Sequence, residues 1–510
     1  MSETILIAGG GTMGAGIAAV AAAAGYDVEV VEPDAAARAR IVSNAQTTVM
    51  DAMPSRSEAT IAIEAVGERL ELKRATFAGF ENALSPDALI ASNTSSLSID
   101  EISAQLQHPE RALGLHFFNP PTKMALVEIV CADATSDEAL TRAQAFIARL
   151  GKTSVVAEDT PGFIVNRVAR PYYLQSMRAL EAGVGPVEDL DALARGVGFR
   201  MGPFELMDLI GLDINLATSE SIYARTGEER LAPVATQREM VAQGRLGRKS
   251  GAGFYDYASG PPVRDDAPPG PVARNEDENV VLLGYGGVAD EIFELLAQAY
   301  EHVTRVESDE LLDELPPDAT IVIDIGDGAS DRSATLRGVA ATLGAEAVIF
   351  ADAYATDLAA CARNFVGPER LVGYGVLGAL ESQAAVEIVD TDAVSDDALE
   401  LAQDVFESLG RRTILVEDRV GLFLGRVIAS IVNEAVAAVD DGVATPDDVD
   451  TAMRLGTNYP IGPIAWGREI GGARLARILG RIAEVEGAAY APHRALWVLD
   501  IDDEPQVAQP

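Results

Sequence analysis

Cysteine, histidine and lysine are scarce in this 510-residue chain, which has two cysteines, four histidines and four lysines. Cys131 and Cys361 lie far apart, so we expect two buried free thiols and no disulfide framework. Basic residues of all kinds number only 39 against 79 acidic ones, which gives a net charge of −40. Because a non-specific nucleic-acid binder needs a basic face, this balance excludes that class of protein.

The acidic charge has two explanations. A high-salt cytoplasm screens self-repulsion within a few ångströms and tolerates such a surface, and this is the explanation we favour. A GC-rich genome, which favours arginine codons over lysine codons, is the other. Both explanations concern the host organism. The reaction therefore has to be inferred from the residues of candidate binding and catalytic sites.

Long apolar runs are also lacking. No stretch of 18 uncharged apolar residues occurs, so we expect no transmembrane helix and no membrane partner. The amino terminus has neither the basic region nor the cleavage site of a signal peptide. These absences predict a cytoplasmic protein.

Alternating strand and helix patterns fill the first part of the chain. Apolar runs at residues 4–8, 27–31, 61–66 and 88–92 predict buried strands, with an alanine-rich helix between the first two. This alternation indicates an α/β fold with a Rossmann-type, doubly wound parallel sheet. From about residue 160 the pattern becomes helical and predicts an all-α domain.

The same pattern restarts after a proline-rich, charged segment. Segments such as PERALGLHFF and PERLVGYGVL, or VVAEDTPGFIVNRV and ILVEDRVGLFLGRV, repeat at a nearly constant offset, which indicates a long duplication. We therefore expect a degenerate repeat of both domains. The predicted division is a Rossmann domain at 1–158, a helical domain at 159–257, a linker at 258–278, a degenerate Rossmann-like domain at 279–416 and a second helical domain at 417–502.

A glycine-rich turn, Gly9-Gly10-Gly11-Thr12-Met13-Gly14, joins the first predicted strand to its helix. Gly9 permits the tight turn, Gly11 lets the backbone approach a pyrophosphate, and Gly14 permits close helix–strand packing. Glu32 stands 18 residues after Gly14, where a carboxylate can bind ribose hydroxyls and would repel a 2′-phosphate. NAD is the expected cofactor, held by Gly9, Gly11, Thr12, Met13, Gly14, Gly16 and Glu32.

His116 ends a predicted strand, in the segment GLHFFNPP. A lone histidine is more often structural than catalytic, so a catalytic role has to be argued from the surrounding sequence. That segment, together with ASNTSSLSI, DTPGFIVNRV, GPFELMDLIGLD and GRLGRKSGAGFYDY, resembles the motifs of the 3-hydroxyacyl-CoA dehydrogenase family over residues 1–257. The two-part layout resembles the branch of that family assigned to 3-hydroxybutyryl-CoA or 3-hydroxyadipyl-CoA oxidation in fatty-acid or aromatic-acid catabolism.

The resemblance implies roles for four residues with the family's spacing. His116 would be the general base that takes the proton of the substrate 3-hydroxyl, as a group that titrates near neutral pH can do. Glu128 would orient the imidazole and stabilise its charged form. Ser95 and Asn166 would hold substrate oxygens.

The resemblance also implies further ligand contacts. Glu68, Lys73, Asn119 and Lys249 match family positions that contact NAD, and no metal ligand is expected. One departure concerns the acyl-CoA substrate: only 31 residues separate Glu32 from Glu64, fewer than is usual in the family. The missing piece is a helical arm that commonly helps to hold CoA, and arginines 38, 40 and 56 are alternative phosphate partners or ordinary solvated side chains.

The second half lacks the catalytic set. Its turn, Gly284-Tyr285-Gly286-Gly287-Val288-Ala289, is followed by Glu307 in place of Glu32. The predicted alignment pairs His116 with Gly375, Ser95 with Tyr354, Asn119 with Gly378, Asn166 with Gly425 and Glu128 with Glu387. We expect this half to be inactive, and its helical end to pack on residues 160–257 in an intrachain pseudo-dimer or to support a homodimer. A dehydrogenase of another small β-hydroxy acid and a non-catalytic NAD-binding protein are the alternative functions.

Overall fold

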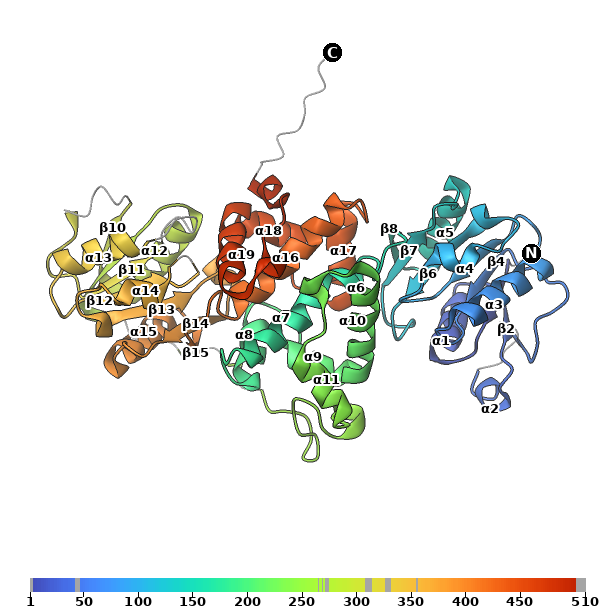
Figure 1. Ribbon diagram of the computed structural model, residues 1–510, viewed down its shortest axis with the longest axis horizontal. Helices are drawn as coiled ribbons and strands as arrows, with labels where there is room; N and C mark the ends of the chain where they lie inside the picture. Colours follow the sequence, from blue (N-terminus) through green and yellow to red (C-terminus); the bar gives the residue numbers. More distant parts are fainter. Residues whose placement is uncertain are drawn as a thin grey trace, which may run out of the picture. The chain divides into compact units, whose positions relative to one another are not determined.

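The computed structural model describes residues 3–41, 46–264, 266–267, 269–270, 275–307, 314–325, 332–354 and 356–500 (Figure 1). The chain divides into two compact units. The first comprises Met1–Ala169, Ser221–Gly227 and Ala437–Asn458, and the second comprises Arg170–Glu220, Glu228–Val436 and Tyr459–Pro510. The first unit thus takes segments from both halves of the sequence. Within the described residues, no helix is long and apolar enough to cross a membrane.

An eight-stranded sheet in the order β3-β2-β1-β4-β5-β6-β7-β8 forms the centre of the first unit. Neighbouring strands pair in parallel, except that β7 is antiparallel to β6. The four strands expected from the sequence are confirmed as β1, β2, β4 and β5. The strands are β1 (Thr4–Ala8), β2 (Asp27–Val31), β3 (Thr47–Met50), β4 (Ile61–Glu64), β5 (Leu89–Ser92), β6 (Ala112–Phe117), β7 (Leu126–Cys131) and β8 (Thr153–Glu158).

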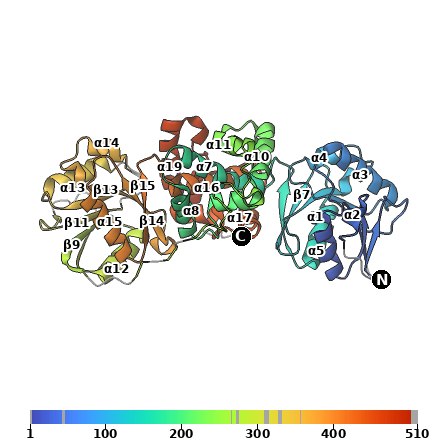
Figure 2. The same ribbon diagram turned by 90° about the horizontal axis from the view of Figure 1, so that it is seen from below.

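Helices cover both faces of this sheet. Ile5 and Ile7 of β1 point into a core shared with α1 (Thr12–Ala23) and α5 (Asp137–Arg149). Leu6 of the same strand points into the opposite core, with α3 (Leu70–Ala83) and α4 (Ile99–Ser103). Figure 2 shows these two helix pairs on opposite sides of the sheet. The strands are continuously apolar because both of their faces are buried, and the doubly wound fold is confirmed.

The remaining helices of the first half follow from local signals. Pro203 begins α9 and Gly211, with a φ of +102°, ends it. The buried Asp191 carboxylate accepts the backbone N–H groups of Phe204 at 2.9 Å and Glu205 at 3.0 Å, at the amino end of the same helix. The elements are α2 (Ala35–Arg38), η1 (Pro109–Arg111), α6 (Val165–Val168), α7 (Arg170–Glu181), α8 (Val187–Gly196), α9 (Pro203–Ile210), α10 (Leu212–Thr226), η2 (Glu229–Leu231), α11 (Ala235–Ala242) and η3 (Arg248–Ser250).

The second half repeats the sheet in the order β10-β9-β11-β12-β13-β14-β15, with β14 antiparallel to β13. Its strands are β9 (Asn275–Leu283), β10 (Tyr300–Val306), β11 (Ile321–Asp324), β12 (Val348–Asp352), β13 (Leu371–Gly375), β14 (Ala385–Asp390) and β15 (Arg412–Glu417). β9 begins at Asn275, inside the segment predicted as a linker. Gly375 lies opposite Glu387 as His116 lies opposite Glu128, so the predicted alignment of the halves holds at this position.

Helices again flank and follow the second sheet. They are α12 (Gly287–Ala299), α13 (Ser333–Thr342), α14 (Leu358–Ala362), α15 (Asp396–Ser408), α16 (Leu424–Asp440), α17 (Pro446–Thr457), α18 (Pro463–Ile470) and α19 (Gly472–Glu486), with short 3₁₀ turns η5 (Pro368–Arg370), η6 (Leu380–Ser382), η7 (Ala488–Tyr490) and η8 (Leu496–Asp500). The confirmed fold is therefore a Rossmann-type sheet domain with a helical region, followed by a repeat of both.

One helix of each half packs on the sheet of the other half. In the second unit, α8 of the first half packs on β14, and Ala384 N–H donates to the Gly196 carbonyl at 2.6 Å. In the first unit, α17 of the second half packs on β7 and β8, and Glu158 N–H donates to the Val443 carbonyl at 2.9 Å. Each sheet is thus covered at its β14–β15 or β7–β8 edge by a helix from the other half of the sequence.

Candidate active site

The glycine-rich turn between β1 and α1 has no room for side chains at two points. Gly9 has a φ of +103°, a conformation that favours glycine. A Cβ atom at Gly14 would lie 1.8 Å from the Gly9 carbonyl oxygen, so the helix can approach the strand only because Gly14 lacks one. Gly11, by contrast, faces open space, with no heavy atom within 4 Å of an added Cβ. This open backbone at the amino end of α1 fits a pyrophosphate.

Glu32 follows directly after β2 and lies beside this turn. Its carboxylate accepts the backbone N–H groups of Gly10 and Asp34, both at 2.8 Å. These two bonds hold the side chain still while leaving lone pairs on both oxygens for further donors, as a ribose-binding carboxylate requires. The turn and Glu32 together fit a dinucleotide such as NAD.

His116 and Glu128 face each other across the β6–β7 pair. The His116 side chain is 8% exposed, and its Nδ1 lies 2.6 Å from Oε2 of the fully buried Glu128. The other carboxylate oxygen of Glu128 accepts the backbone N–H groups of Ile164 at 3.1 Å and Val165 at 2.9 Å. Phe118 and Phe163 lie against the ring, with centroid distances of 4.5 and 5.8 Å. The imidazole is therefore oriented through Nδ1, and Nε2 is left for other chemistry.

Ser95 and Asn166 reach the same end of the sheet from different elements. Ser95 lies in the loop after β5 and is exposed, whereas Asn166 lies in α6 and is partly exposed. The Asn166 side-chain amide donates to the Ser95 carbonyl oxygen at 3.4 Å. The four predicted catalytic residues thus gather at one edge, formed by the β5 loop, the β6–β7 pair and α6.

Glu68 and Lys73 belong to one charge cluster at that edge, in which Lys73 is buried and Glu68 is exposed. Lys73 is 1% exposed, and its ammonium lies 2.9 Å from Glu64 and 3.0 Å from Glu68. Burial by itself raises the pKa of Glu68, but the Lys73 ammonium and hydrogen bonds from Thr94 and Ser96 outweigh it, so the pKa lies below its ordinary value. Glu68 is held as a carboxylate, and it accepts the Ser95 backbone N–H at 3.2 Å.

Comparison with known proteins decides the family. The profile of the 3-hydroxyacyl-CoA dehydrogenase NAD-binding domain matches residues 4–57 and 43–160, and that of the C-terminal domain of the same enzymes matches 162–257 and again 421–506. The chain is 36% identical over 503 residues to the 3-hydroxyadipyl-CoA dehydrogenase of Escherichia coli K12, covering 94% of this chain and 93% of that one. The chain belongs to the 3-hydroxyacyl-CoA dehydrogenase family.

A solved structure and a shorter relative agree with this assignment. The crystal structure of 3-hydroxybutyryl-CoA dehydrogenase from Escherichia coli K12 substr. MG1655 superposes with a TM-score of 0.77 at 32% identity, covering 97% of this chain and 98% of that one. The 3-hydroxybutyryl-CoA dehydrogenase of Mycobacterium tuberculosis is 38% identical over 281 residues, which is 50% of this chain and 98% of that one. This chain is an NAD-dependent 3-hydroxyacyl-CoA dehydrogenase, and NAD is its cofactor.

The other predicted NAD contacts of this dehydrogenase lie in different surroundings. Asn119 is exposed in the loop after β6. Lys249 belongs to the second compact unit, where its ammonium forms an ion pair with Asp213. Lys73 is 1% exposed, and its ammonium faces two carboxylates rather than solvent.

Sequence reasoning missed Glu64 and Asn93, which hydrogen-bond to residues near the predicted site at the carboxyl ends of the strands. Glu64 is fully buried at the end of β4, where it accepts the Lys73 ammonium and, at 2.6 Å, the Ser92 hydroxyl. Asn93 accepts the backbone N–H of Phe117, next to His116, at 2.8 Å. The signal for Glu64 was a charged residue that ends an apolar strand, in the segment IAIE.

The described residues between Glu32 and Glu64 form little regular structure. Between β2 and β4 the described residues form only the four-residue helix α2 and the edge strand β3. The Arg38 guanidinium donates to the carbonyl oxygens of Glu32 at 2.7 Å and Pro33 at 2.6 Å. Arg56 forms an exposed ion pair with Glu58 at 3.2 Å. Neither arginine is held in a built phosphate site.

In the second half, a tyrosine fills the place of the histidine. The Tyr354 hydroxyl donates to Glu387, whose other oxygen accepts the N–H groups of Phe423 and Leu424, as Glu128 accepts those of Ile164 and Val165. A Cβ at Gly375 would lie 2.9 Å from the Tyr354 hydroxyl, and one at Gly425 would lie 2.6 Å from its ring. The two glycines therefore make room for the buried phenol of Tyr354, which takes the place that the imidazole has in the first half.

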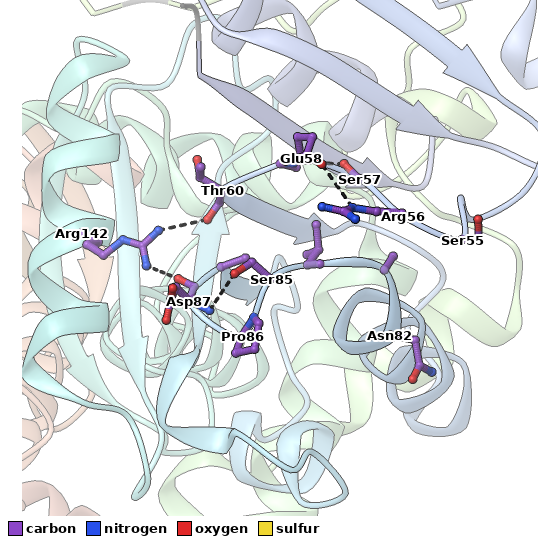
Figure 3. A pocket seen from close by; sticks show the side chains of 14 residues that line it. Ser55, Arg56, Ser57, Glu58, Thr60, Asn82, Ser85, Pro86, Asp87 and Arg142 are labelled. Carbon is purple, nitrogen blue, oxygen red and sulfur yellow. Dashed lines mark hydrogen bonds and ion pairs between the residues drawn. The ribbon is translucent and has the colours of Figure 1, made fainter.

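A hollow of about 650 Å³ lies at the opposite edge of the first sheet (Figure 3). It is bordered by segments 55–60 and 82–88, which precede β4 and β5, and by Arg142 of α5. Arg142 donates to the carbonyl oxygen of Thr60 at 3.1 Å and to that of Asp87. Ligands of open α/β sheets bind at the carboxyl ends of the strands, so this hollow at their amino ends is separate from the His116 site.

Proposed function

We propose that the chain oxidises an (S)-3-hydroxyacyl-CoA to the 3-oxoacyl-CoA, reversibly, with His116 as general base. The observation that carries the proposal is the contact of 2.6 Å between His116 Nδ1 and the buried Glu128 carboxylate. A neutral imidazole that donates its Nδ1–H to Glu128 has its lone pair on Nε2. That nitrogen can take the 3-hydroxyl proton, and Glu128 stabilises the imidazolium that results.

The other residues would bind and orient. When bound, NAD accepts the hydride that leaves C3 of the substrate. In our proposal Ser95 and Asn166 hold the substrate oxygens near His116. In this proposal the nucleotide contacts come from the glycine turn, Thr12, Met13, Gly16, Glu32, Glu68 and Asn119.

The acyl group and the assembly belong to the same proposal. The relatives named above act on 3-hydroxyadipyl-CoA and 3-hydroxybutyryl-CoA, and we propose these two thioesters as the first candidates. We also propose the linear domain division predicted from the sequence, a cytoplasmic location, and a pseudo-dimeric or homodimeric assembly.

One assay tests the reaction against its alternatives. NADH oxidation is followed with acetoacetyl-CoA and, separately, with acetoacetate. Turnover with the thioester alone supports the proposal, and turnover with the free acid supports a dehydrogenase of another small β-hydroxy acid. Tight NADH binding with no turnover of either would indicate a non-catalytic binding protein.

A histidine variant tests the role of His116. We expect His116→Gln to lower kcat by roughly 10²–10⁴-fold and to leave the NADH dissociation constant nearly unchanged, because only proton transfer is lost. His108→Gln is the matched control, since His108 also pairs with a glutamate, at 3.1 Å, but on the surface. An active His116→Gln enzyme, or an equal loss of NADH binding, would contradict the assignment.

A further inference from the structure

A segment of the inactive second half lies in the same compact unit as the His116 site. Residues Ala437–Asn458, which comprise the end of α16 and all of α17, cluster with the first sheet. α17 packs on α6, β7 and β8, and α6 and β7 carry Asn166 and Glu128 (Figure 1). The active-site edge is therefore supported from outside by a helix whose sequence position is far away.

The first direct link is an ion pair. The Asp441 carboxylate lies 2.6 Å from the guanidinium of Arg167, whose side chain is 10% exposed. Arg167 is the residue after Asn166 in α6, and its backbone N–H donates to the Gly162 carbonyl at 3.2 Å. A nearly buried guanidinium needs a counter-charge, so Asp441 stabilises the helix that presents Asn166.

The second link is a steric one. A Cβ at Gly456 of α17 would lie 2.9 Å from Leu126 of β7 and 3.1 Å from Val165 of α6. The backbone N–H of Val165 is one of the two that hold Glu128, at 2.9 Å. We call the two backbone N–H groups that hold Glu128 the Glu128 clamp. α17 approaches closely enough to contact Val165 of this clamp, and it can do so because residue 456 has no side chain.

We infer that the second half supplies positioning residues to the single active site, namely Asp441 and Gly456. They fix α6 against β7, so that the Glu128 clamp and the Asn166 amide keep their places relative to His116. This function rests on the proposed catalytic role of His116. It gives the inactive half a part in the reaction, although none of its residues touches the reacting atoms.

The test uses the full chain with Asp441→Asn and Gly456→Ala. Active sites are counted by NADH titration, and kcat, KM and the pH profile of kcat are then measured with acetoacetyl-CoA. We expect kcat per NADH site to fall about threefold to tenfold for Asp441→Asn and at least about tenfold for Gly456→Ala, because small misplacements of catalytic groups cost that much. We expect KM for NADH to stay within about twofold, since the nucleotide turn is untouched.

Two matched controls separate positioning from general packing. Gly196→Ala adds a methyl group at the equivalent joint of the second unit, where a Cβ would lie 2.5 Å from Ala385, next to a sheet that lacks the catalytic set. Asp447→Asn removes an exposed carboxylate from the first turn of α17. Both controls should keep the wild-type kcat per site, and Asp441→Glu should restore most of what Asp441→Asn loses.

Two outcomes would overturn the inference. One is a wild-type kcat per site in both Asp441→Asn and Gly456→Ala. The other is an equal loss in Gly456→Ala and Gly196→Ala, which would show that packing anywhere in the molecule matters. If Gly456→Ala yields no folded protein, the surface substitution Asp441→Asn and its rescue decide alone. An active His116→Gln enzyme would instead refute the proposed function, so the two failures can be told apart.

Discussion

Single residues distinguish the two halves of this dehydrogenase. Both halves keep a fully buried glutamate held by two backbone N–H groups, Glu128 and Glu387. The first faces an imidazole and the second a phenol. Because burial raises the pKa of Tyr354 well above its ordinary value, its hydroxyl stays protonated and cannot accept a proton as an imidazole can.

The buried Glu387 predicts a pH-dependent loss of stability. Burial raises its pKa to about 7 from an ordinary value of 4.5. Between these two pH values the folded chain keeps the proton that the unfolded chain releases, so wild-type stability falls as pH rises. Glu387→Gln does not titrate, and its side-chain oxygen can still accept from Phe423 and Leu424. We expect its stability relative to wild type to rise by roughly 1–3 kcal/mol from pH 4.5 to pH 7.

Urea unfolding at a series of pH values measures this difference. The exposed carboxylate variant Glu301→Gln, in the same sheet, is the control and should follow the wild-type curve. Parallel curves for Glu387→Gln and wild type would show that Glu387 is ionised in the folded protein throughout this range.

At the level of elements, the strand–turn–helix motifs of the two halves differ in how closely the helix approaches the strand. Gly14 allows α1 to meet the Gly9 carbonyl, whereas Ala289 takes its place in α12. The second turn also has a different backbone, with a φ of +92° at Gly286 against −66° at Gly11. The motif is thus intact in one half and altered in the other.

This comparison predicts the effect of a methyl group at Gly14. We expect Gly14→Ala to lower stability by about 1–3 kcal/mol and to weaken NADH binding by more than about tenfold, because α1 must move away from β1. Gly11→Ala is the control, since an added Cβ there meets no protein atom. It should weaken NADH binding while leaving the thermal midpoint unchanged. Wild-type NADH affinity in Gly14→Ala would contradict the assigned nucleotide site.

At the scale of the molecule, the duplication should leave one working site per chain. The carboxyl edge of the second sheet is occupied by Arg474 of α19, which lies 2.9 Å from Asp352 and donates to the Val376 carbonyl at 2.7 Å. The altered turn, the buried Tyr354 and Arg474 distinguish this edge from its counterpart in the first sheet.

The expected NADH stoichiometry is therefore one per chain. Fluorescence titration or calorimetry with the purified full chain measures it, and Gly11→Ala should bring the number close to zero. A second binding event, retained in Gly11→Ala, would show that the second sheet also binds the nucleotide.

Much of the fold and the site could be predicted from local sequence. The turn at Gly9 and the motif around His116 depend on residues a few positions apart, where strand and helix periodicity and glycine requirements operate. The repeat could be predicted because whole segments recur in the same order at a nearly constant offset. The buried position of Lys73 could not be predicted in this way, because it depends on Glu64 and Glu68 meeting it after the sheet has formed.

The sequence by itself determined the family, the cofactor and the spacing of Ser95, His116, Glu128 and Asn166. The tertiary structure decided which segments support that set. The sequence of an amphipathic helix such as α17 predicts an apolar face. It does not predict which segment that face packs on, because the partner lies more than half of the chain away and is selected by shape and charge. The contacts of Asp441 with Arg167 and of Gly456 with Val165 exist only once residues 437–458 are packed against the first sheet.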